Sequence, residues 1–244
     1  MGFYRGPNII TNGLVLALDA GNTKSYQSGS TTWYDKSGNG KNGTLVNGPT
    51  YSSGSGGSIV FDGVDDYISI DNTLLSTLTD DNSLTVSILI NINEPTLSTR
   101  GGLICNQKFS SETDSGGFGF VIESGGIIAV NLTKEIGGIK TSYEVLSSFY
   151  MNRQQYTFYT FTYDSITKTV ITYKNAVQQA SSTNVSYGWT KNTTNRPTRI
   201  GINTQGGWGA YYKMNIVYTS IYNRALPATE VLQNYNAIKG RFNL

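Results

Sequence analysis

Apolar segments in this chain are short, mostly alternate with polar residues, and are separated by Gly, Asn, Ser and Asp. Successive side chains of a strand point to opposite faces, so this pattern predicts half-buried strands joined by turns. Many short strands with turn residues between them are typical of a β-sandwich or barrel. We expect strands at Leu14–Leu18, Ser58–Phe61, Tyr67–Ile70, Leu84–Ile92, Gly102–Asn106, Phe118–Glu123, Ile127–Leu132, Tyr156–Tyr163, Thr169–Lys174, Arg199–Ile202 and Tyr211–Tyr222.

Two segments refine this expectation. Asp-Gly-Val-Asp-Asp at 62–66 has the turn chemistry of a hairpin-like connection between its flanking strands. From Pro227 to about Lys239 the apolar residues Val231, Leu232, Tyr235 and Ile238 follow a helical period, and Glu230 lies near the expected helix start. The sequence therefore predicts an all-β, two-sheet antiparallel sandwich with one short C-terminal helix.

The length of 244 residues suits one large β domain, which buries enough surface to be stable without a disulfide or metal. We assign residues 13–244 to the sandwich. Residues 1–12 precede the first strong strand and are expected to form an N-terminal arm.

Composition removes several classes of function. The chain has no His and a single Cys, Cys105, within an apolar run, so metal-binding or nucleophilic sites that depend on these residues are not expected. A net charge of +2 with 14% charged residues provides no basic stripe for nucleic acid. No apolar stretch approaches the ~20 residues of a membrane helix, so we expect no membrane insertion. The N-terminal residues lack the apolar core of an export signal, which fits release by cell lysis.

Four sequence blocks, in order, resemble the concanavalin A-like (laminin-G-like) lectin/glucanase superfamily, in the form found in tailed-phage virion proteins. They are Gly13–Asn22, Trp33–Leu45 with its Trp-x-Asp-x-Ser-Gly-Asn-Gly pattern, Ser58–Ile68 with Phe-Asp-Gly, and Ile221–Tyr235. The resemblance implies a jelly-roll sandwich. Two positions depart from the family: Asn175-Ala176 stands where an Asn-Gly turn is usual, and Met214 stands where Gly is common.

The residues of these blocks have plain structural uses. Asp62 can bond the neighbouring backbone while Gly63 supplies a positive φ. Asp35 and Asn39 can organise their loop by side-chain to backbone hydrogen bonds. Trp33 and Phe61 are large enough to fill the space between two sheets.

Calcium is the one cofactor left open, since related lectin-like domains often bind it and the ion needs 6–8 oxygen ligands. The best candidates are Asp19, Asp35 and Asn39, with Asn22, Asp65 and Asp66 as further oxygen donors. Their spacing matches no fixed calcium motif, and loop-ordering carboxylates are the favoured alternative. We therefore expect no cofactor.

Glycan binding needs an aromatic platform beside a few fixed polar groups. Trp208, Tyr211 and Tyr212 lie in or next to a Gly-rich loop, and Trp189 lies in a similar polar loop. The alternative is that these aromatics cover sheet edges or a subunit interface.

Glycoside hydrolysis needs two carboxylates at a defined separation. Sandwich glucanases carry Glu-x-Asp-x-Glu or Glu-x-Asp-x-x-Glu on one strand, and neither run occurs in this chain. Asp65 and Asp66 are adjacent, so in a strand they would face opposite sides, and Glu112 and Asp114 lie in a Ser/Gly-rich segment. We expect no enzyme activity.

We therefore expect a phage virion structural protein, an outward-facing module on the capsid exterior or in a tail or neck fibre. It would cement neighbouring virion proteins, adsorb to host-surface glycans, and form a homo-oligomer by analogy with repeated assemblies. Phe3, Tyr4, Arg5 and Pro7 give the arm apolar anchors and one bidentate donor for docking. The alternative is a free carbohydrate-binding lectin domain, with a glycoside hydrolase as a distant third.

Overall fold

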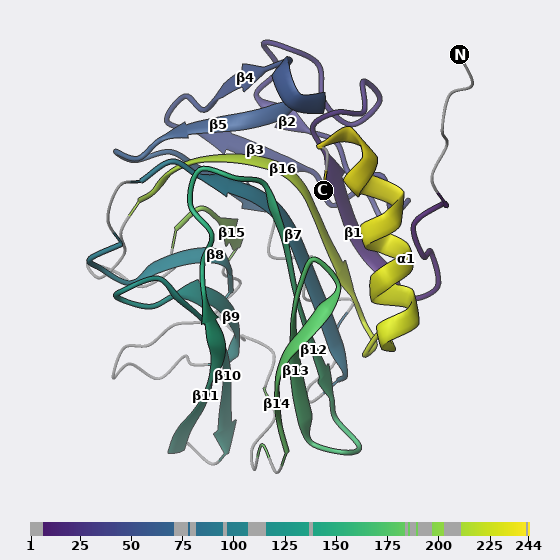
Figure 1. The fold of residues 1–244 in the computed structure, drawn as a ribbon, viewed down its shortest axis with the longest axis vertical. Coiled ribbons are helices and arrows are strands. Elements are labelled where there is room, and N and C mark those ends of the chain that lie inside the picture. The colour runs from purple at the N-terminus through teal and green to yellow at the C-terminus, as the bar shows by residue number, and fades with distance from the viewer. Residues whose placement is uncertain are drawn as a thin grey trace.

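The computed structural model describes residues 7–70, 78, 82–94, 97–106, 116–136, 139–183, 185, 189, 197–202, 211–242 and 244. Within them two eight-stranded sheets pack face to face, and every pair of named strands is antiparallel (Figure 1). The first sheet has the order β14 (Val177–Ser182), β13 (Thr169–Lys174), β12 (Thr157–Asp164), β7 (Leu84–Ile92), β16 (Lys213–Tyr222), β5 (Ser58–Asp62), β4 (Thr50–Ser52), with β1 (Leu14–Asp19) also paired to β16. The second has the order β11 (Ile139–Tyr150), β10 (Ile127–Ile136), β9 (Gly117–Ile122), β8 (Gly101–Cys105), β15 (Thr198–Ile200), β6 (Tyr67–Ile70), β3 (Gly43–Val46), β2 (Thr32–Trp33).

The expected strands are confirmed, most of them within one or two residues. Five strands were not expected: β2, β3, β4, β11 and β14. β14 reads Val-Gln-Gln-Ala-Ser-Ser and lies at the edge of the first sheet, where it pairs with one described strand and its burial is partial. Strands of this kind leave no apolar alternation in the sequence, so only pairing with a neighbour reveals them.

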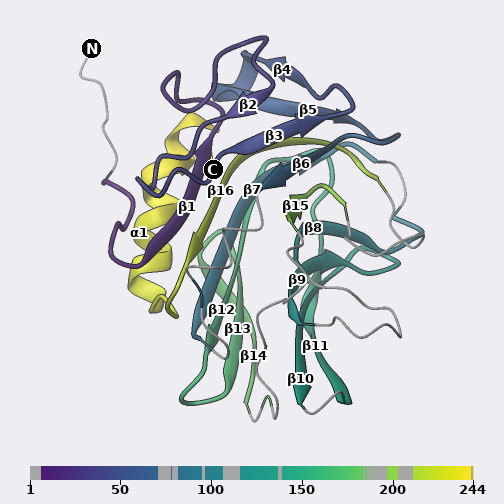
Figure 2. The same cartoon turned by 180° about the vertical axis from the view of Figure 1, so that it is seen from behind.

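The expectation of a hairpin at Asp62–Asp66 is wrong. β5 lies in the first sheet between β4 and β16, whereas β6 lies in the second sheet between β3 and β15. The connection therefore crosses from one sheet to the other (Figure 2). Its local chemistry is as expected, because Asp62 Oδ1 accepts from the Val64 amide and Gly63 has φ +84°.

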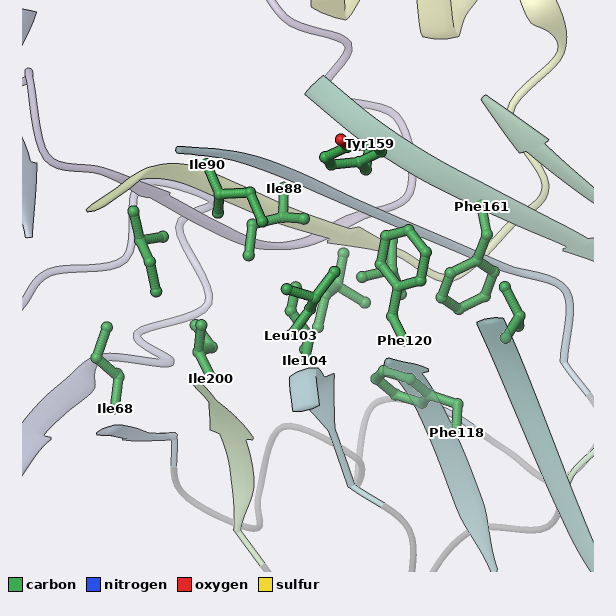
Figure 3. Packing of buried hydrophobic residues seen from close by; sticks show 14 of the residues in the cluster. Ile68, Ile88, Ile90, Leu103, Ile104, Phe118, Phe120, Tyr159, Phe161 and Ile200 are labelled. Atoms are coloured by element: carbon green, nitrogen blue, oxygen red, sulfur yellow. The ribbon is translucent and has the colours of Figure 1, made fainter. Parts of the chain in front are cut away.

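The core fills the space between the sheets. Ile88, Ile90, Tyr159 and Phe161 of the first sheet face residues of the second (Figure 3), and the ring centroids of Phe120 and Phe161 lie 5.1 Å apart. Trp33 and Phe61 are fully buried as expected, and so are Cys105 and Met214. Burial raises the pKa of the Cys105 thiol to about 12, so this residue is an inert part of the structure.

Helix α1 (Ala228–Ile238) packs on the outer face of the first sheet, beside β1 and β16 (Figure 1). A short 3₁₀ turn, η3 (Lys239–Arg241), continues it, and a second, η1 (Gly54–Gly56), precedes β5. The expected apolar stripe is only partly right, because Leu232 is exposed and Asn234 is buried. In the described residues no helix is long and apolar enough to cross a membrane.

The N-terminal segment is fastened to this helix. The amide of Ile10 donates to Asn234 Oδ1, the Tyr222 hydroxyl donates to the Ile10 carbonyl, and Gln233 Nε2 donates to the Asn8 carbonyl. Residues 8–12 of the expected arm thus lie against the domain itself. Pro7 is exposed, whereas Phe3, Tyr4 and Arg5 lie outside the described residues.

The Asn175-Ala176 pair still forms a tight hairpin between β13 and β14. Lys174 pairs with Val177 across the turn, and the two intervening residues have φ +50° and +62°. Two successive positive φ values are typical of a type I′ turn, which normally uses Gly at the second position.

Candidate functional site

The aromatic residues expected to bind glycans do not form a surface platform in the described residues. Trp189 is fully buried, its Nε1 donates to the Asn82 carbonyl at 2.9 Å, and its ring meets Phe118 edge-on. Tyr212 is 3% exposed, and its hydroxyl donates to the Thr99 carbonyl. Burial raises the pKa of Tyr212 to about 12. Tyr211 is half-buried, and Trp208 lies outside the described residues.

Asp35 and Asn39 serve the backbone, as the alternative to calcium required. They lie in residues 34–41, which we call the edge-capping loop because it covers the free edge of β1. Asp35 Oδ1 accepts from the amides of Ala17 and Ser37, and Oδ2 accepts from the Lys41 amide and the Ser37 hydroxyl. Asn39 Nδ2 donates to the carbonyls of Leu14 and Val15. A cation at Asp35 would have to displace these donors.

Asp19 is likewise engaged. Its carboxylate forms a two-pronged pair with the Arg241 guanidinium, at 2.8 and 3.2 Å, and also accepts from the Gly21 amide. This ion pair joins the end of β1 to the turn after α1. A guanidinium neutralises the charge that a calcium ion would need. The contacts of Asp19, Asp35 and Asn39 therefore favour loop-ordering roles for these side chains over calcium binding.

A different acidic group lies in the connection between β5 and β6. Oxygens of Asp62, Asp65 and Asp66 lie within 4.8 Å of one another. Asp66 is 3% exposed, and its Oδ2 accepts from the Asp62 amide at 2.9 Å. Burial raises the pKa of Asp66, and the charges of Asp62 and Asp65 add to the rise. These bonds close the crossing connection, which accounts for the group structurally.

One hollow among the described residues lies where β11 passes into β12. We call residues 150–156 the cleft connection. Its first part, the polar hollow, has a volume of about 620 Å³. The polar hollow is lined by Glu94, Met151, Asn152, Arg153, Gln154 and Gln155.

The second part, the apolar hollow, has a volume of about 340 Å³ and shares Met151 and Arg153 with the first. Its other lining residues are Leu97, Gly125, Gly126 and Tyr150. Tyr150 ends β11 and is 65% exposed, so its ring stands at the rim. We call the two hollows together the cleft. Each lies within the size range of small-molecule sites.

Hydrogen bonds from three segments hold the walls of the cleft. The carbonyls of Leu97, Ser98 and Thr99 accept from the Gly125 amide, the Ser124 hydroxyl and the Tyr212 hydroxyl. The Met151 amide donates to the Gly126 carbonyl, and the Gln154 amide donates to the Ile92 carbonyl. Tyr212, expected to contact a glycan, instead donates to the Thr99 carbonyl in the segment that follows Leu97.

Side chains along the cleft connection are positioned in the same way. Asn152 Oδ1 accepts from Lys174 Nζ at 2.7 Å, and the Asn152 amide donates to the Tyr159 hydroxyl at 2.8 Å. Glu94 Oε1 accepts from the Lys213 amide at 2.9 Å. Gln154 has φ +59°, a left-handed backbone conformation that residues other than Gly and Asn rarely adopt. The cleft is thus preformed, and it retains one strained backbone position.

An ionic group joins the segments that carry the lining residues of the apolar hollow. Arg100 Nε lies 2.6 Å from Glu123 Oε1, and its Nη2 lies 2.8 Å from Glu144 Oε1. Burial raises the pKa of Glu123, which Arg100 opposes and Glu144 reinforces. One guanidinium therefore bridges both carboxylates, and it joins the segment directly before β8 to the β9–β10 turn and to β11.

The cleft offers a stacking ring, a carboxylate acceptor, guanidinium and amide donors, and an apolar recess. This combination has the chemistry to accommodate a polar ligand that has apolar faces. Sequence reasoning missed it because Tyr150-Met-Asn-Arg-Gln-Gln follows a polar edge strand and matches no motif. The usable signal was an aromatic residue followed by a run of amide and guanidinium side chains outside any turn motif.

Comparisons with known proteins agree with this architecture. The chain superposes on the binding domain of Paraclostridial Mosquitocidal Protein 1 with a TM-score of 0.71 and 17% identity, covering 93% of this chain and 52% of that one. The ligand binding domain of botulinum neurotoxin serotype D, in complex with N-acetylneuraminic acid, gives 0.69 and 15%, covering 94% and 52%. Domain 4 of AbnA, an extracellular arabinanase from Geobacillus stearothermophilus, in complex with arabinotriose, gives 0.65 and 18%, covering 91% and 98%.

The chain spans about half the length of the toxin domains and nearly all of the arabinanase domain. At these identities the likeness shows a shared fold. No curated protein matches the chain in sequence. Residues 62–232, more than half of the chain, match the family described as the concanavalin A-like lectin/glucanases superfamily. The four blocks, the two-sheet sandwich and this match agree, and the chain belongs to that superfamily.

Proposed function

We propose that the chain is a non-enzymatic glycan-binding module and that the cleft is its binding site. The observation that carries the proposal is the exposed ring of Tyr150 beside a preformed cleft lined by hydrogen-bonding side chains. Sugar rings stack their apolar faces on aromatic side chains and direct their hydroxyls to groups such as Glu94 and Arg153. Two of the structural relatives are complexes with sugars, which supports the same class of ligand.

The carboxylates near the cleft favour binding over hydrolysis. Glycosidases place two carboxyl groups across one sugar bond. Glu94 is the one acidic residue among the described residues that line the cleft. Glu123 and Glu144 both pair with Arg100, so neither is arranged as a free acid or nucleophile.

A glycan array followed by calorimetry tests this proposal. Tyr150→Ala should weaken binding of the selected glycan about fivefold, because aromatic stacking contributes about 1 kcal/mol. Tyr34→Ala is the matched control, since Tyr34 is also an exposed tyrosine but lies in the edge-capping loop. If the unchanged protein and Tyr150→Ala bound the glycan with equal affinity, the cleft would not be the binding site. Cleavage of the glycan by the unchanged protein would refute the non-enzymatic assignment.

We also propose that the module is displayed on the exterior of a phage virion, on the capsid or in a tail or neck fibre. The support is the resemblance of the sequence blocks, Trp33–Leu45 above all, to virion proteins of tailed phages. Other virion proteins and host-surface glycans would be its partners. Because residues 8–12 pack on α1 and β16, the part of the arm left for docking is residues 1–7.

Mass spectrometry of purified virions checks the location. Deletion of residues 2–7 should leave the domain folded and abolish incorporation, since residues 8–12 and their bonds to the helix remain. Normal incorporation of the truncated chain would refute the docking role of Phe3, Tyr4 and Arg5. A chain absent from virions that still binds glycans would be the free lectin.

A further inference from the structure

The two hollows of the cleft differ in what they can bind. The polar hollow is lined by a carboxylate, a guanidinium and three amide side chains, with Glu94 and Arg153 of opposite charge. A neutral ring with several hydroxyls satisfies such a set, because each hydroxyl both donates and accepts. This hollow therefore suits an uncharged sugar unit.

The apolar hollow suits a different group. Leu97, which is 8% exposed, and the bare backbone of Gly125 and Gly126 form its walls, with Met151 and the ring of Tyr150. A Cβ added at Gly126 would lie 3.0 Å from Leu97 Cδ1, so the recess depends on the absence of a side chain there. A hydroxyl placed here would lose hydrogen bonds to water, whereas a methyl group would gain from burial.

The boundary between the hollows has its own chemistry. Met151 and Arg153 line both of them. A substituent that reaches from the polar to the apolar hollow passes from one set of lining residues to the other, and Arg153, common to both, carries a guanidinium that can donate to a carbonyl oxygen. A ligand with a polar ring, then a carbonyl, then a methyl group matches this sequence of surfaces.

We propose that the cleft selects oligosaccharides that contain a neutral 2-acetamido sugar, with the acetamido methyl in the apolar hollow, its carbonyl at Arg153 and the ring hydroxyls in the polar hollow. This proposal rests on the glycan-binding function proposed above and names its ligand class. The specificity comes mainly from the recess, because a plain hexose leaves the recess empty. The loss or gain of one such apolar group changes binding about tenfold or more.

Calorimetry with three trisaccharides tests the ligand class. The β-1,4-linked trimer of N-acetylglucosamine should bind the full chain at least tenfold more tightly than the corresponding trimer of glucose. A trimer of the 6-deoxy sugar rhamnose, which presents a methyl group without the amide, is the third arm and should bind less tightly than the N-acetylglucosamine trimer. In saturation-transfer NMR of the unchanged protein, the acetamido methyl protons should receive the largest transfer.

Leu97→Ala locates the effect. It should lower affinity for the acetamido trimer about tenfold and leave the glucose trimer unchanged, with Val177→Ala, an exposed apolar residue on β14, as the matched control. Folding of the variants is checked by thermal unfolding, and the NMR result needs no variant. Equal binding of the acetamido and glucose trimers, or preference for the rhamnose trimer, overturns the acetamido assignment but leaves glycan binding in place. A glycan array without any binding overturns both.

Discussion

The edge-capping loop and the cleft connection use similar polar residues in opposite ways. In the loop, Asp35, Ser37 and Asn39 turn their side chains onto backbone groups of β1 and of the loop itself. In the cleft connection, backbone amides donate to acceptors of other segments, and the side chains of Arg153, Gln154 and Gln155 are exposed. Polar side chains that serve the fold must stand at fixed spacings, which creates a motif. Side chains that face a ligand need no such spacing.

The largest expected effect is that of Asp35→Ala on stability. This change removes the acceptor of four hydrogen bonds at the edge of β1 and leaves partly buried donors unpaired, so we expect a loss of about 3 kcal/mol in the free energy of unfolding. Urea unfolding measures it. Glycan affinity should not change.

Two outcomes would break the contrast between the two segments. A stability loss below about 1 kcal/mol would show that the Asp35 bonds do not hold the loop. A fall in glycan affinity without unfolding would make the edge-capping loop part of the binding site. Asp35→Asn, which keeps one oxygen acceptor, should lie between the alanine variant and the unchanged protein.

A smaller effect of opposite sign is expected for Gln154→Gly. The left-handed backbone at Gln154 costs about 1 kcal/mol, and glycine relieves it. Ala176→Gly is the matched control, since Ala176 has a similar positive φ, +62°, in the β13–β14 turn. Both variants should unfold at a higher temperature, and only Gln154→Gly should weaken glycan binding. If only Ala176→Gly raised the unfolding temperature, the backbone of the cleft connection would carry no strain.

The same contrast explains what could be predicted from the sequence. Alternation and motif residues located most strands, the C-terminal helix and the loop-ordering roles of Asp35, Asn39 and Asp62, because these features follow from local spacing. The hairpin expected at Asp62–Asp66 was wrong because local turn chemistry does not specify which sheet the next strand joins. β11 and β14 escaped prediction because edge strands need no buried alternating face.

The candidate site was harder to predict than the fold. Trp189 was chosen for its polar surroundings in the sequence, yet it fills the core against Phe118. No sequence pattern marks Tyr150, although its position at the end of β11 exposes it. Burial of an aromatic residue depends on which distant strands cover it. A short stretch of sequence does not specify such long-range pairing, for example that of β16 with β7 and β5.

The smallest expected effect is the change in stability on replacing Asp66. It tests whether the carboxylates between β5 and β6 serve the backbone, as those of the edge-capping loop do. Burial raises the pKa of Asp66, so between the ordinary pKa of an aspartate and the raised value the folded chain binds more protons than the unfolded chain. The contribution of Asp66 to stability therefore falls as pH rises through that window. Asp66→Asn keeps an acceptor for the Asp62 amide and cannot ionise. The variant should be slightly more stable than the unchanged protein at pH 7, and the difference should vanish below the ordinary aspartate pKa. If added Ca²⁺ instead stabilises the unchanged protein and not the variant, Asp62, Asp65 and Asp66 bind a cation. The same carboxylates would then both accept hydrogen bonds from their own backbone and bind a ligand.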